Sequence, residues 1–378
     1  MSDTIAAGST AGLVEDTTIF GGSHHGRQPV TLAGLMSVSA VTGLLERDAE
    51  IGSLDSLLRR VQAGCGGAIV IEGEAGIGKT ALLEHGGASA AAAGMTVLRA
   101  RGGELEREFP WGVVRQLFEP WLSRLERGHR SRLLAGSAAL AGPLFDPGAG
   151  DRPAADDSFP ALHGLYWTAV NAAREAPLLL SVDDLHWCDG PSLRFAAHLV
   201  TRLEGLPIML LATVRPLGSE SASDPALLAH LTTHRSAEQL RPSPLSERAC
   251  LELVDARLED GADPEFGRAC HQMSRGNPFL LSALLDAWRA EHAHATAGDA
   301  ERIRQMRPEA VSRSVLVRLA TMGDGCQALA HAVAVLGARA EFRQARRLVA
   351  LDTDTAVTAA AALSRAGIIR GTATLEFV

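Results

Sequence analysis

Short apolar runs alternate with helix-like segments over the first two thirds of the chain, from about residue 43 to residue 242. The runs are rich in Val, Ile and Leu, which is typical of strands buried on both faces of a parallel sheet. The alternation of strand and helix predicts an α/β fold with a parallel five-stranded sheet. The predicted strands are 68–72, 95–100, 178–182, 207–215 and, more weakly, 238–241.

The pattern changes after the last predicted strand. Between residues 245 and 295 the apolar positions recur with helical spacing, which predicts a helical lid. From about residue 308, three helical stretches precede two strand-like runs, an order that suggests a winged-helix fold. We therefore expect a disordered leader at 1–42, an α/β domain at 43–242, the lid at 243–305 and a winged-helix-like domain at 306–378. Because the last run ends at Val378, we expect that last domain to be incomplete, with unpaired backbone groups on its final strand.

Composition narrows the classes of protein. Apolar types make up 46% and charged types 21% of the 378 residues, a globular balance with enough apolar material for more than one core. The net charge of −8 lacks the basic field of a dedicated nucleic-acid binder. The five cysteines are scattered and form no C-x-x-C pair, as in reduced thiols of a cytoplasmic protein, and we expect no contact with a membrane.

Lysine is almost absent from the chain. Of the 36 basic residues, Lys79 is the only lysine and all the others are arginines. Arginine replaces lysine wherever only a surface charge is needed, but not where a compact ammonium must fit among phosphate oxygens. Lys79 therefore marks a candidate site before any motif is considered.

Lys79 lies in a phosphate-binding motif. The segment matches G-x-x-x-x-G-K-[ST] and stands between a predicted strand and a helix. Backbone N–H groups of such a loop turn toward phosphates; Lys79 neutralises β/γ charge and the Thr80 hydroxyl ligates Mg²⁺. The alternative is a glycine-rich turn carrying a solvated lysine. The expected nucleotide-binding residues are Gly73, Glu74, Ala75, Gly76, Ile77, Gly78, Lys79, Thr80 and Ala81.

Two acidic residues follow the buried run at 178–182. Asp183 is expected to hold Mg²⁺ through water, and Asp184 to polarise the water that attacks the γ-phosphate. Two adjacent carboxylates at a strand end are costly without a cation, although a capped turn is the alternative. Thr213 and Arg215, at the end of the next predicted strand, are placed to sense the γ-phosphate, and a surface arginine is the alternative for Arg215.

These motifs together resemble the ATPase region of the large ATP-binding LuxR-type transcriptional regulators, which belong to the STAND class of AAA-like ATPases. The resemblance covers about residues 43–378 and implies that the α/β domain at 43–242 is a P-loop AAA-like ATPase domain. It also implies an ATP-driven switch in which Arg47 and, in the lid, Gly276 and Pro278 approach the nucleotide. By itself, Gly276-Asn277-Pro278 indicates only a turn between two helices. The motifs that carry the resemblance are Leu45-Glu-Arg-Asp-Ala-Glu50, the P-loop, Arg101-Gly-Gly-Glu-Leu-Glu106, Val182-Asp-Asp-Leu-His-Trp187, Ala212-Thr-Val-Arg215 and Ser274-Arg-Gly-Asn-Pro-Phe279.

The sequence thus favours a Mg²⁺-dependent signalling switch that binds ATP, hydrolyses it slowly and lacks the DNA-binding domain of its longer relatives. Its expected partners are ATP and ADP, a second copy of the chain, and a regulatory protein or small-molecule inducer. Two other functions stay open: a nucleotide-binding scaffold without turnover, and a DNA-remodelling or origin-recognition AAA-type ATPase. Direct DNA contact is not expected, because only Arg343, Arg346 and Arg347 form a basic stripe and no amide or aromatic reader accompanies them.

Overall fold

The computed structural model describes most of the chain after the predicted leader, which lies outside the described residues together with residue 43. The described residues are 44–103, 107–145, 158–216, 224–258, 261–291, 295–306, 319–320, 322–336, 340–366, 368–370 and 374–377.

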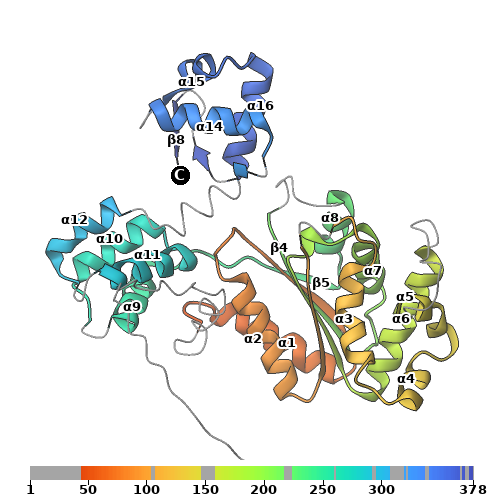
Figure 1. Cartoon of the computed structure of the whole chain (residues 1–378). Helices are drawn as coiled ribbons and strands as arrows, with labels where there is room; N and C mark the ends of the chain where they lie inside the picture. The colour runs from red at the N-terminus through yellow and green to blue at the C-terminus, as the bar shows by residue number, and fades with distance from the viewer. Residues whose placement is uncertain are drawn as a thin grey trace, which may run out of the picture. The chain divides into compact units, whose positions relative to one another are not determined.

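A five-stranded parallel sheet forms the centre of the first domain (Figure 1), which confirms the predicted fold class. The strand order is β2-β3-β4-β1-β5. Every position of β1, β3 and β4 is buried, as their continuous apolar runs require. The strands are β1 (Gly67–Glu72), β2 (Thr96–Arg101), β3 (Leu178–Asp183), β4 (Ile208–Val214) and β5 (Ala237–Leu240).

Helices cover both faces of this sheet. Alternate side chains of β1 divide between them: Ile69 and Ile71 pack with α1 and α2, whereas Ala68 and Val70 belong to the core with α3, α6 and α7. This alternation follows from the two-residue period of a strand. The two sets of helices are α1 (Asp48–Gln62) and α2 (Lys79–Ala92) on one face, and α3 (Gly112–Leu122), α6 (Ser158–Glu175) and α7 (Gly190–Val200) on the other.

The spatial order of the strands differs from their order in the chain. Strand β4 lies between the P-loop strand β1 and the acidic strand β3, whereas β2 stands at the edge of the sheet. The carboxyl ends of β1, β4 and β3 are therefore neighbours, and the residues that follow them share one site. Shorter elements complete the domain: α4 (Arg127–Leu133), η4 (Gly136–Ala141), α5 (Gly142–Phe145), η5 (Leu185–Trp187) and α8 (Pro225–Thr233).

The predicted lid is a helical bundle with its own core. Phe266 and Trp288 pack there with ring centroids 5.0 Å apart, among buried Leu and Cys side chains. None of the helices in the described ranges is long and apolar enough to cross a bilayer. The lid elements are α9 (Glu247–Arg257), α10 (Pro264–Ser274), α11 (Pro278–Glu291), η6 (Ala297–Asp299) and α12 (Ala300–Gln305).

The C-terminal elements follow the order helix, strand, helix, helix, strand, strand, which is the order of a winged helix. Strand β6 was not expected from the sequence, because two residues are too short to show a period. Strand β8 pairs antiparallel with both β6 and β7. That this domain is incomplete stays a prediction. The elements are α14 (Asp324–Leu336), β6 (Ala340–Glu341), α15 (Phe342–Leu348), α16 (Thr353–Arg365), β7 (Ile369–Arg370) and β8 (Thr374–Phe377).

Candidate nucleotide site

The loop between β1 and α2 surrounds the amine of Lys79. Lys79 is the first residue of α2 and is only 8% exposed. Its Nζ donates to the carbonyls of Gly73 and Glu74, each at 2.8 Å. Burial lowers the pKa of Lys79, and the nearby charge of Asp184 opposes that shift. A buried ammonium at the start of a helix, held by its own loop, is suited to binding phosphate oxygens.

The N-terminus of α2 has no side-chain cap. Gly78 occupies the N-cap position in the left-handed region with φ +102°, and within the described residues no side-chain cap is bonded to this helix. The first N–H groups of a helix need an acceptor, and the helix dipole favours an anion there. Loop, helix and lysine therefore fit the polyphosphate of a nucleotide.

The two predicted ligands of Mg²⁺ lie side by side. The Thr80 hydroxyl is 3.1 Å from one oxygen of the Asp183 carboxylate and 3.3 Å from the other. The buried Thr213 hydroxyl donates to Asp183 at 2.6 Å and accepts from the backbone N–H of Asp184 at 2.8 Å. Hydroxyl and carboxylate oxygens are what Mg²⁺ prefers beside phosphate, so this pair fits the ion. The Thr213 hydroxyl is thus engaged by the two acids, although the sequence favoured a role toward phosphate.

Asp184 stands in a special backbone position. Its φ of +52° places it in the left-handed region, which turns the chain out of β3. Arg101, at the end of β2, donates to Asp184 Oδ2 at 3.2 Å and lies 3.9 Å from Asp183. Arg101 is exposed, so this ion pair is worth little to stability. It does bring a cation to the carboxylate that is expected to polarise water.

Arg215, His186 and Trp187 lie together beyond the ends of β4 and β3. The guanidinium of Arg215 is 5.8 Å from the centre of the Trp187 ring, and its charge acts on both Lys79 and His186. His186 is 1% exposed, and neither ring nitrogen has a hydrogen-bond partner among the described residues. Burial, reinforced by Arg215 and Lys79, lowers the pKa of His186 to about 3. The imidazole is therefore neutral at ordinary pH.

Arg47 and Pro278, which the resemblance assigns to the nucleotide, lie at the junction of loop and lid. The guanidinium of Arg47 is buried and donates to the carbonyls of Glu46, Ile77 and Ser243. Pro278 begins α11. Contact of either residue with a nucleotide remains a prediction.

Two other residues at this junction were not predicted. Asn277 donates to the carbonyl of Ala75 at 2.9 Å, and the Glu46 carboxylate accepts from Ser246 at the start of α9. Both belong to motifs that sequence analysis singled out. The sequence does not show which residue each side chain binds, because the hydrogen-bond partner is about 200 residues away along the chain in each case.

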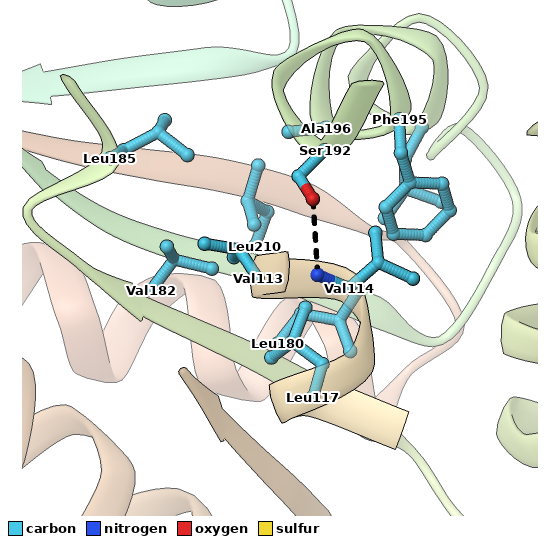
Figure 2. Close-up of a pocket in the computed structure, with 11 residues that line it drawn as sticks. Val113, Val114, Leu117, Leu180, Val182, Leu185, Ser192, Phe195, Ala196 and Leu210 are labelled. Atoms are coloured by element: carbon cyan, nitrogen blue, oxygen red, sulfur yellow. Dashed lines mark hydrogen bonds between the residues drawn. The ribbon is translucent and has the colours of Figure 1, made fainter. Parts of the chain in front are cut away.

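The chain also holds a small apolar cavity between the sheet, α3 and α7 (Figure 2). It has a volume of about 10 Å³ and is lined almost wholly by apolar side chains, among them Val114 and Leu117. Its polar lining residue Ser192 accepts from the N–H of Val114 at 3.1 Å, which Figure 2 shows. A cavity of this size could hold at most one water molecule, and its apolar lining offers that water too few hydrogen-bond partners. We therefore interpret it as a packing defect of the core and not as a binding site.

Comparison with known proteins identifies similar ATPase domains. Residues 43–211 match the family described as AAA ATPase domain. An uncharacterized protein of Rhizobium meliloti (strain 1021) is 25% identical over 49% of this chain. The alignment covers 20% of that relative, so the chain spans about a fifth of its length.

Two solved structures share the fold. The Aeropyrum pernix ORC1 protein, in complex with DNA, matches with a TM-score of 0.50 at 15% identity, over 90% of each chain. A Walker-type ATPase of Pyrococcus abyssi matches with a TM-score of 0.52 at 13% identity, over 88% of this chain and 93% of that chain. With the geometry above, these matches support an AAA-like P-loop ATPase fold.

Proposed function

We propose that the protein is a Mg²⁺-dependent ATP-binding switch that hydrolyses ATP slowly. The observation that carries this proposal is the 3.1 Å contact between Thr80 Oγ1 and Asp183, beside the buried amine of Lys79. The amine of Lys79 and the hydroxyl of Thr80 follow β1, and the carboxylate of Asp183 ends β3. These three groups, which have the chemistry of a nucleotide site, lie at the same edge of the sheet. Bound Mg²⁺ would screen the phosphate charge there.

Each side chain has a separate task in this proposal. Lys79 binds the β- and γ-phosphates, and Thr80 with Asp183 holds the metal ion. Asp184 orients the attacking water and accepts its proton. Arg215 stabilises charge on the γ-phosphate. The hydrogen bond from Arg101 to Asp184 competes with the hydrogen bond that Asp184 would make to the attacking water, which is consistent with slow turnover.

The ordered motifs and the much greater length of the relative support a proposal about the wider role. We propose that the chain is the regulatory ATPase portion of a LuxR-type transcriptional regulator of the STAND class, acting in the cytoplasm. ATP and ADP are its ligands, and a second copy of the chain, a regulatory protein or a small-molecule inducer sets its state.

Phosphate release at saturating ATP and Mg²⁺ tests turnover. The wild-type rate should exceed that of Asp184→Asn, which keeps the shape of the side chain but loses the base, by at least about tenfold. Both proteins should bind ATP. Equal rates at the background level, with ATP binding intact, would favour a nucleotide-binding scaffold instead.

A DNA-remodelling or origin-recognition function is the second candidate, because the similarity to the DNA-bound Aeropyrum pernix protein covers 90% of the chain. The basic stripe on α15 is weaker than its sequence indicated. Arg346 donates to the Leu351 carbonyl and the Thr353 hydroxyl, which lie close to it in the chain. Of the three arginines, only Arg343 and Arg347 are exposed. A DNA-binding protein should bind duplex with steep salt dependence and lose affinity in the double variant Arg343→Ala/Arg347→Ala. No duplex binding at low salt would exclude this function.

A further inference from the structure

Three consecutive carbonyls of the phosphate-binding loop are held from outside the loop. The carbonyl of Ala75 accepts from the Asn277 side-chain amide at 2.9 Å, and that of Gly76 from the Phe279 N–H at 3.2 Å. The carbonyl of Ile77 accepts from Arg47 at 3.2 Å. Since the N–H groups of a phosphate-binding loop turn toward the phosphates, the opposite carbonyl edge is the part that other residues can hold. Two of the three contacts come from the lid.

The fit between loop and lid requires glycine at position 76. Gly76 has φ +82°, and a Cβ there would lie 2.7 Å from both Asn277 Oδ1 and the Cβ of Phe279. Asn277 uses both ends of its amide. Its oxygen accepts from the N–H groups of Phe279 at 3.1 Å and Leu280 at 3.2 Å, which caps α11, while its nitrogen binds Ala75. One side chain thus fixes the start of a lid helix against the loop.

The other end of the lid is joined to the same region. Arg47 connects the carbonyl of Ile77 to that of Ser243, the latter at 2.8 Å. The Glu46 carboxylate accepts from Ser246, the N-cap of α9, at both its N–H and its hydroxyl. Both entry points of the lid, before α9 and before α11, are therefore hydrogen-bonded to the loop or to Glu46-Arg47.

The two entry points are also joined to each other. The N–H of Leu245 donates to the carbonyl of Gly276 at 2.8 Å. Gly276 has φ +72°, and a Cβ there would collide with the Leu245 backbone. A movement of the lid would therefore disturb the hydrogen bonds to the Ala75, Gly76 and Ile77 carbonyls at the same time.

We propose that Asn277 is a positioning residue of the nucleotide site: through the Ala75 carbonyl it sets the shape of the phosphate-binding loop and couples nucleotide binding to the lid. This inference rests on the proposed function. The coupling does not need a lid side chain to touch the nucleotide. By linkage, a lid held on the loop raises nucleotide affinity, and a bound nucleotide holds the lid by the same factor.

The variant Asn277→Asp separates positioning from capping. Aspartate keeps an acceptor for the N–H groups at the start of α11, but it cannot donate to Ala75 and sets a carboxylate oxygen against that carbonyl. Asn277→Ser is a neutral second variant that caps the helix and is too short to reach Ala75. Asp263→Ala is the matched control. The Asp263 carboxylate caps α10 by accepting from the N–H of Glu265, and among the described residues it makes no hydrogen bond to the phosphate-binding loop.

Two measurements decide the question: the Kd of ADP by calorimetry, and hydrogen exchange of α11 and of residues 73–78 with and without ADP. We expect Asn277→Asp and Asn277→Ser to weaken ADP binding by about fivefold to tenfold, the cost of one hydrogen bond, and to lose ADP-induced protection of α11. Their melting temperatures without nucleotide should stay within a few degrees of wild type. Asp263→Ala should keep both the affinity and the protection.

Wild-type affinity together with wild-type protection in both Asn277 variants would overturn the coupling. Failure of the proposed function looks different. In that case wild type itself would not bind ADP, or Lys79→Ala would bind it equally well.

Discussion

The hydroxyl of Thr213 lies 2.6 Å from the carboxylate of Asp183 and bonds it across two neighbouring strands, β4 and β3. The same oxygen accepts from the N–H of Asp184. One fully buried hydroxyl thus fixes the expected metal ligand and the start of the turn that carries the expected base.

Replacement of Thr213 by valine should destabilise both acids. Thr213→Val keeps the shape of the side chain, but it removes the acceptor of the Asp184 N–H and the short hydrogen bond to the Asp183 carboxylate, which among the described residues keeps only its contacts with Thr80 and Arg101. We expect the free energy of unfolding to fall by about 2 kcal/mol and the Mg²⁺ concentration needed for tight ATP binding to rise. Urea unfolding and ATP titrations at several Mg²⁺ concentrations measure the two effects. Thr213→Ser should restore both, and a valine variant that matches wild type would refute this role.

Asp189 should be a large contributor to stability, because it caps two helices. Its carboxylate accepts from Ser192 in its own helix α7, and from Trp111 and Val113 at the start of α3. Asp189→Ala leaves these buried N–H groups unsatisfied, and we expect a loss of about 3 kcal/mol in urea unfolding. Asp224→Ala removes the cap of α8, which has one such bond, and should cost only about 1 kcal/mol. Equal losses would contradict the double cap.

The buried imidazole of His186 should make the protein sensitive to acid. Its pKa is near 3 in the folded protein against an ordinary value of 6.5. Between these pH values the unfolded chain binds the extra proton, so His186 contributes stability that is complete above about pH 6.5 and is lost as pH falls toward 3. The slope approaches 1.4 kcal/mol per pH unit for one group.

Urea unfolding at pH 7 and pH 5 of wild type and His186→Leu tests this effect. The variant should lose less stability on acidification than wild type does. His331→Leu, at an exposed position of α14, should behave like wild type. Identical acid losses in wild type and His186→Leu would show that His186 carries no proton-linked stability.

The sheet and the phosphate site could be predicted from sequence because each rests on local patterns. Runs of buried apolar residues define β1, β3 and β4, and the single lysine stands in a loop motif that needs only eight consecutive residues. The helix cap at Asp189 has a local cause of the same kind, because Gly-Pro-Ser follows it and proline favours the first turn of a helix. In each case the cause of the structure lies within a few positions along the chain.

The contacts between loop and lid could not be predicted in the same way. Asn277 donates to the backbone carbonyl of Ala75. Because every residue has such a carbonyl, nothing in the residue type at position 75 indicates the contact. The role of Thr213 depends on β4 lying between β1 and β3, which is a fact of strand order in space. The short strand β6 was missed because it has two residues and forms only through its pairing with β8.

The most direct test of the account is a calorimetric titration of ATP with Mg²⁺ into wild type, Lys79→Ala and Lys79→Arg. We expect saturable one-site binding to wild type and a loss of about tenfold to a hundredfold in Lys79→Ala, the cost of a charge-assisted hydrogen bond. Lys79→Arg should be impaired as well, since a guanidinium does not fit the space of the ammonium held by Gly73 and Glu74. Undiminished ATP affinity in Lys79→Ala would contradict the assignment of this loop as the nucleotide site.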